Sequence, residues 1–176
     1  MTRYRAVSVL LVAALGAGCS AQPANDSGNS TASSTASKSP AAPAATTHDG
    51  RAVEVTGNDT MKFSVTEITA APGEKLSITF VNVGTTPKFS MGHNWVLLAA
   101  DTDVPAFLQA SAESVTTDYV PGGAQGDKIL AATKLLGPNE RDTVTFTAPT
   151  TPGRYEFICS FPGHYQVGMR GVLIVT

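Results

Sequence analysis

The sequence predicts an all-β domain, a sandwich of two sheets with about eight strands and one inserted helix. Three observations lead to this prediction. Short segments of the 176-residue chain alternate apolar and polar residues, which is the period of a strand with one buried face. Gly, Pro and Asn clusters separate these segments at short intervals. One stretch alone, residues 102–115, has helical spacing.

The first 19 residues have the features of a bacterial secretion signal. Arg3 and Arg5 precede an apolar run that is too short to span a bilayer. The run ends in Leu15-Gly-Ala-Gly-Cys19, which resembles a lipobox, although Leu15 lies four residues before the cysteine rather than the usual three. We expect Cys19 to carry lipid. The alternative is an ordinary cleaved signal that happens to contain Cys19.

Residues 20–52 contain no Val, Ile, Leu, Met, Phe, Trp or Tyr. A segment rich in Ala, Ser, Thr and Pro has no apolar surface to offset the entropy of ordering, so it is predicted to be a disordered tether. His48 lies in this tether, and we expect it to be solvated and without function. One compact domain, residues 53–176, follows.

The strands of this domain can be placed in order. The first two are predicted at 53–56 and 61–68, with a turn at 57–59 between them, and the third at 76–83 after a Pro72-Gly73 turn. Residues 93–99 form an apolar run, as expected for a strand buried on both faces. The remaining strands are predicted at 128–136, 143–146, 154–159 and 171–175, with turns at 138–139 and 149–153.

The segment 102–115 is predicted to be a helix inserted between strands. Apolar residues from Val104 to Val115 recur near helical spacing, and Asp101 to Asp103 offer N-cap residues. Pro105 is tolerated in a first helical turn. Residues 116–127 are predicted to be a loop.

Charge and cysteine count restrict the function. The formal net charge of −2 gives no indication of nucleic-acid binding. If Cys19 carries lipid, Cys159 has no disulfide partner, and a lone thiol in an exported protein calls for another explanation. Metal ligation supplies one.

A copper site is predicted from the C-terminal residues. Cys159, His164 and Met169 lie at five-residue intervals after a strand whose alternation points Cys159 into the core. Thiolate, imidazole and thioether together suit copper, and His93 would complete a trigonal His2Cys set with a weak axial Met. Taken singly, each of the four has a simpler explanation as core filler or loop residue; taken together, they favour copper. A Cys/His hydrolase is an alternative, but no oxyanion hole or orienting third group is evident.

Five motifs carry a family resemblance. They occur in order across the domain, at 57–59, 91–97, 133–137, 142–146 and 159–164. They resemble the azurins and auracyanins of the cupredoxin family. The resemblance implies a Greek-key β-sandwich and one type 1 copper ion held by His93, Cys159 and His164. It further implies Met169 as the axial ligand and the backbone carbonyl of Gly92 as a weak second contact.

The same resemblance assigns supporting roles. Asn94 would tie the cysteine loop to its neighbours, the alternative being a plain polar strand residue; Phe161 and Pro162 would exclude water or merely pack the turn. Trp95 is expected in the core. An apolar docking patch would consist of Met61, Met91, Phe161, Pro162 and Gly163.

Two departures from azurin are evident. Four residues separate His164 from Met169, as in auracyanins, where azurins have three. Thr86 and Ser90 are polar where azurins have apolar patch residues. Residues 102–127 match the azurin flap that carries a helix.

The predicted function is that of a membrane-tethered, monomeric electron carrier and not an enzyme. It would pass single electrons between membrane-associated redox proteins through His164. It would be anchored at the outer face of the cytoplasmic membrane or at the periplasmic or cell-surface side. Copper storage or delivery is the alternative, although the tether has one His and no Met. A multicopper oxidase or nitrite reductase would need further copper ligands.

Overall fold

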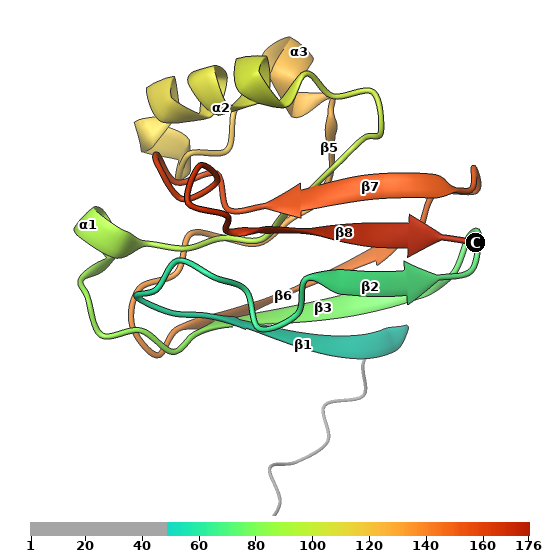
Figure 1. Cartoon of the computed structure of the whole chain (residues 1–176), viewed down its shortest axis with the longest axis horizontal. Coiled ribbons are helices and arrows are strands. Elements are labelled where there is room, and N and C mark those ends of the chain that lie inside the picture. The colour runs from blue at the N-terminus through green and yellow to red at the C-terminus, as the bar shows by residue number, and fades with distance from the viewer. Residues whose placement is uncertain (1–48) are drawn as a thin grey trace, which may run out of the picture. The chain divides into compact units, whose positions relative to one another are not determined.

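The computed structural model describes residues 49–176, which form two β-sheets and four short helical segments (Figure 1). The smaller sheet has the order β1-β3-β6, with bounds Arg51–Gly57, Lys75–Asn82 and Arg141–Thr147. The larger sheet has the order β2-β8-β7-β4-β5, with bounds Glu67–Ala70, Arg170–Val175, Gly153–Ile158, Val96–Leu98 and Ile129–Ala132. The β1–β3 and β2–β8 pairs are parallel and the other pairs are antiparallel. The predicted eight-stranded sandwich is confirmed.

The core lies between the two sheets and is rich in aromatic rings. Trp95 is fully buried, with its ring centroid 5.3 Å from that of Phe157 and 6.0 Å from that of Phe146. Phe63 contacts Phe80 and Phe157 at centroid distances of 5.7 and 5.6 Å. Trp95 is therefore a core residue, as predicted.

The predicted strand 61–68 is wrong over most of its length. Met61 has a left-handed backbone with φ 54°, and its N–H donates to the Asn58 carbonyl at 2.9 Å, so the chain turns there. Phe63 makes only an isolated bridge to Gly57, and regular pairing begins at Glu67. The alternation in this segment reflects burial of Phe63 against the core without regular pairing to a neighbouring strand.

Other strand boundaries differ from the prediction by smaller amounts. β4 covers only Val96–Leu98, and β5 only Ile129–Ala132; before β4 and after β5 the pairing is reduced to an isolated bridge between His93 and Leu136. β1 begins at Arg51, inside the segment that composition assigns to the tether. There the Arg51 guanidinium pairs with Glu74 and donates to the Thr69 carbonyl, which extends the ordered strand.

The inserted helix is confirmed as α2, Val104–Glu113. The Asp103 carboxylate accepts from the Ala106 N–H at 3.2 Å, and Pro105 lies in the first turn. Phe107 is buried with Val96, Leu98 and Ile158, so α2 covers the outer face of the larger sheet (Figure 1).

The predicted loop 116–127 and the chain before His93 contain short helical turns that the sequence did not indicate. They are the 3₁₀ turn Val115–Thr117, the short helix α3, Gly123–Gly126, and the short helix α1, Lys88–Met91. Each is too short for a helical period to show in the sequence. Within residues 49–176, no helix is long and apolar enough to cross a membrane.

Candidate metal centre

Three buried side chains meet at one point of the molecule. His93 Nδ1 lies 3.1 Å from His164 Nδ1, and Cys159 Sγ lies 3.4 Å from the same nitrogen. The three ligand atoms all lie within 4.8 Å of one another. His93 and Cys159 are fully buried, and only 3% of His164 is exposed. The fold therefore brings together the three residues that the sequence analysis placed around copper.

Cys159 and His164 belong to the loop that connects β7 to β8. Cys159 follows Ile158, the last residue of β7, and its N–H donates to the Met169 carbonyl at 3.1 Å. The Met169 N–H in turn donates to the His164 carbonyl at 2.9 Å, and Gly163 supplies the left-handed turn residue with φ 87°. These bonds close the loop so that both side chains face inward.

His93 reaches the same point from another part of the chain. Its N–H and carbonyl exchange hydrogen bonds with Leu136 at 3.1 and 2.7 Å, just before β4. A Cβ at the preceding Gly92 would lie 2.7 Å from the Lys88 carbonyl oxygen and 2.8 Å from the Leu135 side chain. Glycine at position 92 thus allows the chain to pass close to Lys88 and Leu135 directly before His93. A contact from the Gly92 carbonyl to copper stays a prediction.

Burial sets the protonation of the metal-free site. It raises the pKa of Cys159 to about 12, although backbone hydrogen bonds from Asn94 and Phe161 act in the opposite direction. Burial, followed by the nearby His93 charge, lowers the pKa of His164 to about 4. Burial also lowers the pKa of His93, while Asp59 partly opposes this effect. At neutral pH the metal-free site therefore holds a thiol and two neutral imidazoles.

The donor set fits a copper ion. When each neutral imidazole carries its proton on Nε2, the two Nδ1 lone pairs, 3.1 Å apart, point toward the same small space as the Cys159 sulfur. A cation that accepts soft sulfur and borderline nitrogen satisfies all three donors together. Metal binding would convert the thiol to thiolate and release its proton.

Met169 is fully buried in the core next to this group. Its backbone is bonded to those of Cys159 and His164, as described above. A Cβ at Gly57 would lie 2.7 Å from the methyl carbon of Met169, so the absence of a side chain at position 57 makes room for this thioether. The axial role of Met169 stays a prediction.

Asn94, two residues before β4, links this part of the chain to the cysteine loop through both ends of its amide. Its Oδ1 accepts from the Ser160 N–H at 2.9 Å, and its Nδ2 donates to Ser160 Oγ at 2.8 Å. Asn94 and Ser160 are both buried. This is the contact that the family resemblance implied for Asn94.

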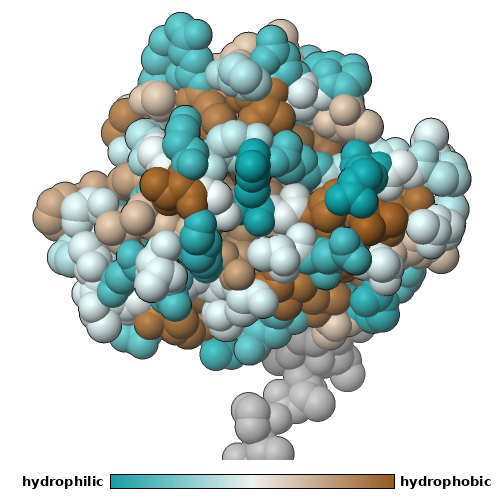
Figure 2. Space-filling model, viewed as in Figure 1, coloured by the Kyte–Doolittle hydropathy of each residue, from teal (hydrophilic) through white to brown (hydrophobic). Residues whose placement is uncertain are grey.

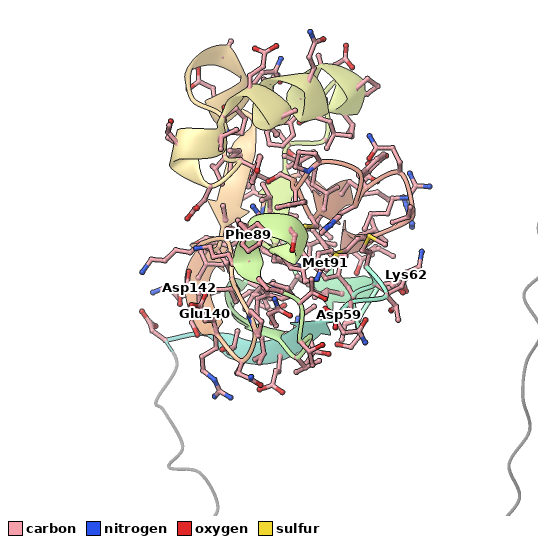
Figure 3. All side chains as sticks on the ribbon, turned by 90° about the vertical axis from the view of Figure 1, so that its left-hand side faces the viewer. Asp59, Lys62, Phe89, Met91, Glu140 and Asp142 are labelled. Carbon is pink, nitrogen blue, oxygen red and sulfur yellow. The ribbon has the colours of Figure 1, made fainter. Side chains whose placement is uncertain are left out.

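The five residues of the expected docking patch differ in exposure. Pro162 and Gly163 are exposed, Met61 and Met91 are half-buried, and Phe161 is only 9% exposed, with its ring 4.6 Å from the His164 ring. Phe89 in α1 is 84% exposed and is absent from the predicted patch. Figure 3 shows Phe89 and Met91 close together at this end of the domain. The sequence feature that could have pointed to Phe89 is an apolar residue between the polar Lys88 and Ser90, four positions before His93.

Comparison with known proteins agrees with this site. The family described as copper-binding proteins, plastocyanin/azurin family, matches residues 50–176. The azurin of Pseudomonas chlororaphis is 36% identical over 126 residues, which cover 70% of this chain and 96% of that protein. The outer membrane protein H.8 of Neisseria gonorrhoeae is 37% identical over 116 residues, or 64% of this chain and 61% of that protein.

A solved structure shows the same fold. The dithionite-reduced auracyanin of Roseiflexus castenholzii superposes with a TM-score of 0.60 at 34% identity, covering 71% of this chain and 96% of that one. The family match spans the whole described sandwich, including the His93, Cys159 and His164 group. The chain therefore belongs to the plastocyanin/azurin family of copper-binding proteins, with a cupredoxin fold.

Proposed function

We propose that the protein is a membrane-tethered blue copper protein that carries single electrons between redox partners. The observation that supports this most directly is the buried convergence of His93, Cys159 and His164. When bound there, copper would supply one-electron chemistry by alternating between Cu(II) and Cu(I). The rest of the function depends on what the side chains around it do.

The first task of these side chains is to hold the ligands in one geometry. His93 is fixed by its two bonds to Leu136, and the cysteine loop is fixed to Asn94. Met169 would be the weak axial ligand and the Gly92 carbonyl a more distant one. A preformed ligand set reduces the rearrangement that accompanies each change of oxidation state.

The second task is to keep water out while leaving one short route to the surface. Phe161 covers one side of the His164 ring at a centroid distance of 4.6 Å. The exposed Pro162 and Gly163 directly precede His164, so this imidazole lies just below the surface. We infer that electrons enter and leave through His164, and that redox partners dock on the patch of Met61, Met91, Phe161, Pro162 and Gly163.

The third part of the proposed function is the location of the protein. The signal-like start and Cys19 lie outside the described residues, so lipid anchoring at the exported face of a membrane rests on the sequence. The name of the related outer membrane protein H.8 agrees with a membrane association. On the one face shown in Figure 2, apolar side chains form separate groups among polar ones. A monomeric state is part of the proposal and rests on the sequence analysis.

Copper titration of the metal-free protein tests the proposed site. Cu(II) should produce an intense visible charge-transfer band that disappears on reduction, and it should raise the melting temperature because it binds the native state. Cys159→Ala should abolish the band. Ser90→Ala, which removes only an exposed hydroxyl bonded to the Pro87 carbonyl, is the matched control and should retain it. A colourless wild type would contradict the proposal.

The electron-carrier role needs a separate test from storage or delivery. A carrier should exchange electrons between its reduced and oxidised forms rapidly while retaining its copper against a competing chelator. A delivery protein should lose copper readily and exchange electrons slowly. The burial of all three ligands disfavours delivery, since an acceptor must reach the ion to remove it.

A further inference from the structure

An unusual backbone turn lies beside the candidate copper site. Asp118 and Tyr119, between the Val115–Thr117 turn and α3, have successive left-handed conformations with φ 57° and 60°. Residues other than glycine adopt this conformation at a cost, so two in succession persist only where surrounding contacts hold them. The contacts of this turn therefore indicate what it holds.

The backbone of the turn is bonded to the cysteine loop. Ser160 Oγ donates to the Tyr119 carbonyl at 2.7 Å and accepts from Asn94 Nδ2 at 2.8 Å. Asn94 Nδ2 also lies 3.5 Å from the Asp118 carbonyl. The Ser160 hydroxyl thus uses its donor on the turn and an acceptor site on Asn94, directly after Cys159.

The side chain of Tyr119 contacts the next residue of the loop, Phe161. Its ring meets Phe161 nearly edge-on, with centroids 4.9 Å apart and planes at 61°. Phe161 in turn lies against the His164 ring at 4.6 Å and 32°. The turn also reaches α1, since the Asp118 carboxylate lies 3.8 Å from Lys88 Nζ. One turn of the inserted segment therefore contacts the residues that directly follow His93 and Cys159, and it reaches His164 through the Phe161 ring.

We propose that the Asp118–Tyr119 turn is a clamp on the copper-ligand loop, in which Tyr119 is a positioning residue for His164 and Ser160 joins the clamp to Asn94. The clamp belongs to the metal-free protein as well. Its effect on copper rests on the proposed function. With the clamp intact, the imidazole plane and the cysteine loop are held in one arrangement before the metal binds.

Two pairs of variants test the clamp. Tyr119→Gly removes the ring but keeps the carbonyl, and glycine adopts φ 60° without steric cost. Asn139→Gly is its control, because Asn139 is an exposed residue with φ 61° that has no contact with the site. Ser160→Ala removes the hydroxyl link, and Ser160→Thr restores a hydroxyl at the same position.

Amide hydrogen exchange of the copper-free protein is the first measurement. Tyr119→Gly and Ser160→Ala should speed exchange of the His164 and Ser160 amides about tenfold, the size expected for loss of one well-made buried contact. Asn139→Gly should not change it, and Ser160→Thr should restore protection. The exchange rates of amides in the β3–β6 pairing should be unchanged in every variant.

The second measurement is the spectrum of the copper-loaded protein. Tyr119→Gly should change the ratio of its charge-transfer bands and its copper hyperfine splitting, whereas Asn139→Gly should not. Unchanged exchange at His164 and Ser160 would overturn the clamp, as would an equal loss of protection throughout the domain. Faster local exchange in a protein that never binds copper would support the clamp and contradict the proposed function.

Discussion

Burial controls the chemistry of the individual ligands. His164 is almost fully buried, and its pKa falls to about 4 in the folded metal-free protein, from an ordinary value near 6.5. The neighbouring thiol has its pKa raised to about 12 by the same cause. Both shifts favour the neutral forms, so the fold provides an uncharged site that gains charge only when the metal arrives.

The shifted pKa of His164 predicts a pH-dependent stability of the copper-free protein. Between pH 6.5 and about 4, the unfolded chain binds a proton at this residue that the folded chain does not. Stability is therefore fully present above pH 6.5 and falls as the pH is lowered toward 4, by up to about 3 kcal/mol from this residue. Urea unfolding at pH 7, 5.5 and 4.5 would measure the loss.

His164→Gln is the control for that experiment, because it removes the titrating group and keeps a polar side chain of similar reach. The variant should have a shallower pH dependence than wild type. The pKa of His93 is also lowered by burial, so part of the slope should remain. Equal slopes in the two proteins would mean that His164 is not buried in its neutral form.

The proposed role of Met169 predicts that substitutions there change the reduction potential of the bound copper. As a weak axial ligand it should tune the copper without being required for binding. Met169→Leu, a swap of similar volume in a fully buried position, should keep the colour and raise the potential, because loss of an axial donor favours Cu(I). Met169→Gln should lower the potential through a harder oxygen donor. Voltammetry that finds the wild-type potential in both variants would remove Met169 from the site.

The sequence predicted some residues of the site and missed others. The ligand candidates were found because their residue types carry the chemistry and because Cys159 and His164 are close in the chain. Ser160 and Tyr119 were missed because their contact joins residues 41 positions apart and follows no period. Phe89 was missed although it stands between the polar residues Lys88 and Ser90, because that local pattern does not by itself show that the aromatic side chain remains 84% exposed.

At the scale of elements, close packing between β7 and β8 depends on a glycine. Gly171 is paired across the strands with Phe157. A Cβ at position 171 would lie 2.3 Å from the Phe157 ring and 2.6 Å from the Thr66 carbonyl oxygen. The Phe157 ring, which also contacts Trp95, thus occupies the space that a side chain at 171 would need.

Gly171→Ala should therefore destabilise the domain by about 1–3 kcal/mol, the usual range for overpacking a tight core. Gly122→Ala is the matched control, because its Cβ would meet no atom within 4 Å and its φ of −98° suits any residue. Thermal unfolding of the two variants compares them directly. Equal stability would show that the β7–β8 pair can relax around the added methyl group.

Element prediction succeeded where a local pattern matched the tertiary contacts. α2 was recognised because its cap, its Pro105 and its apolar spacing all agree. The segment 61–68 was wrongly predicted as a strand because an irregular chain can also have every second residue buried, as Phe63 and the half-buried Val65 are. Strands β4 and β5 proved short because their pairing is irregular: the register shifts between Leu97 and Leu98, and toward the copper-ligand end only the isolated bridge between His93 and Leu136 follows.

At the scale of the whole molecule, the anchoring prediction concerns residues outside the described range. If Cys19 carries lipid, the wild-type protein should fractionate with membranes and partition into detergent. Cys19→Ser should abolish lipidation and release the domain, while leaving its copper spectrum unchanged. A processed Cys19→Ser protein that stayed on the membrane would contradict lipid anchoring.

The end of the domain shown in Figure 3 is the face through which we expect electrons to pass. Met91 and the exposed Phe89 lie near each other there, with Asp59 and Lys62 on one side and Glu140 and Asp142 on the other. α1 lies at the same end as the ligand loop between β7 and β8 (Figure 1). An apolar surface lets a partner approach closely and expel water while the complex stays transient.

A charge placed on this face should slow electron exchange without altering the copper site. Met91→Lys should keep the visible spectrum, because Met91 is not a ligand candidate. It should reduce the rate of electron self-exchange about tenfold or more, because two like charges must be desolvated face to face when two molecules meet. Line broadening in NMR spectra of partly oxidised samples measures that rate, and high salt removes long-range repulsion from the comparison.

Thr150→Lys is the control. It adds the same charge in the exposed turn before β7, at the opposite end of the strands, and should leave the rate near that of wild type. An equal rate in wild type and Met91→Lys would mean that electrons leave through another surface, and His164 would lose its role as the port.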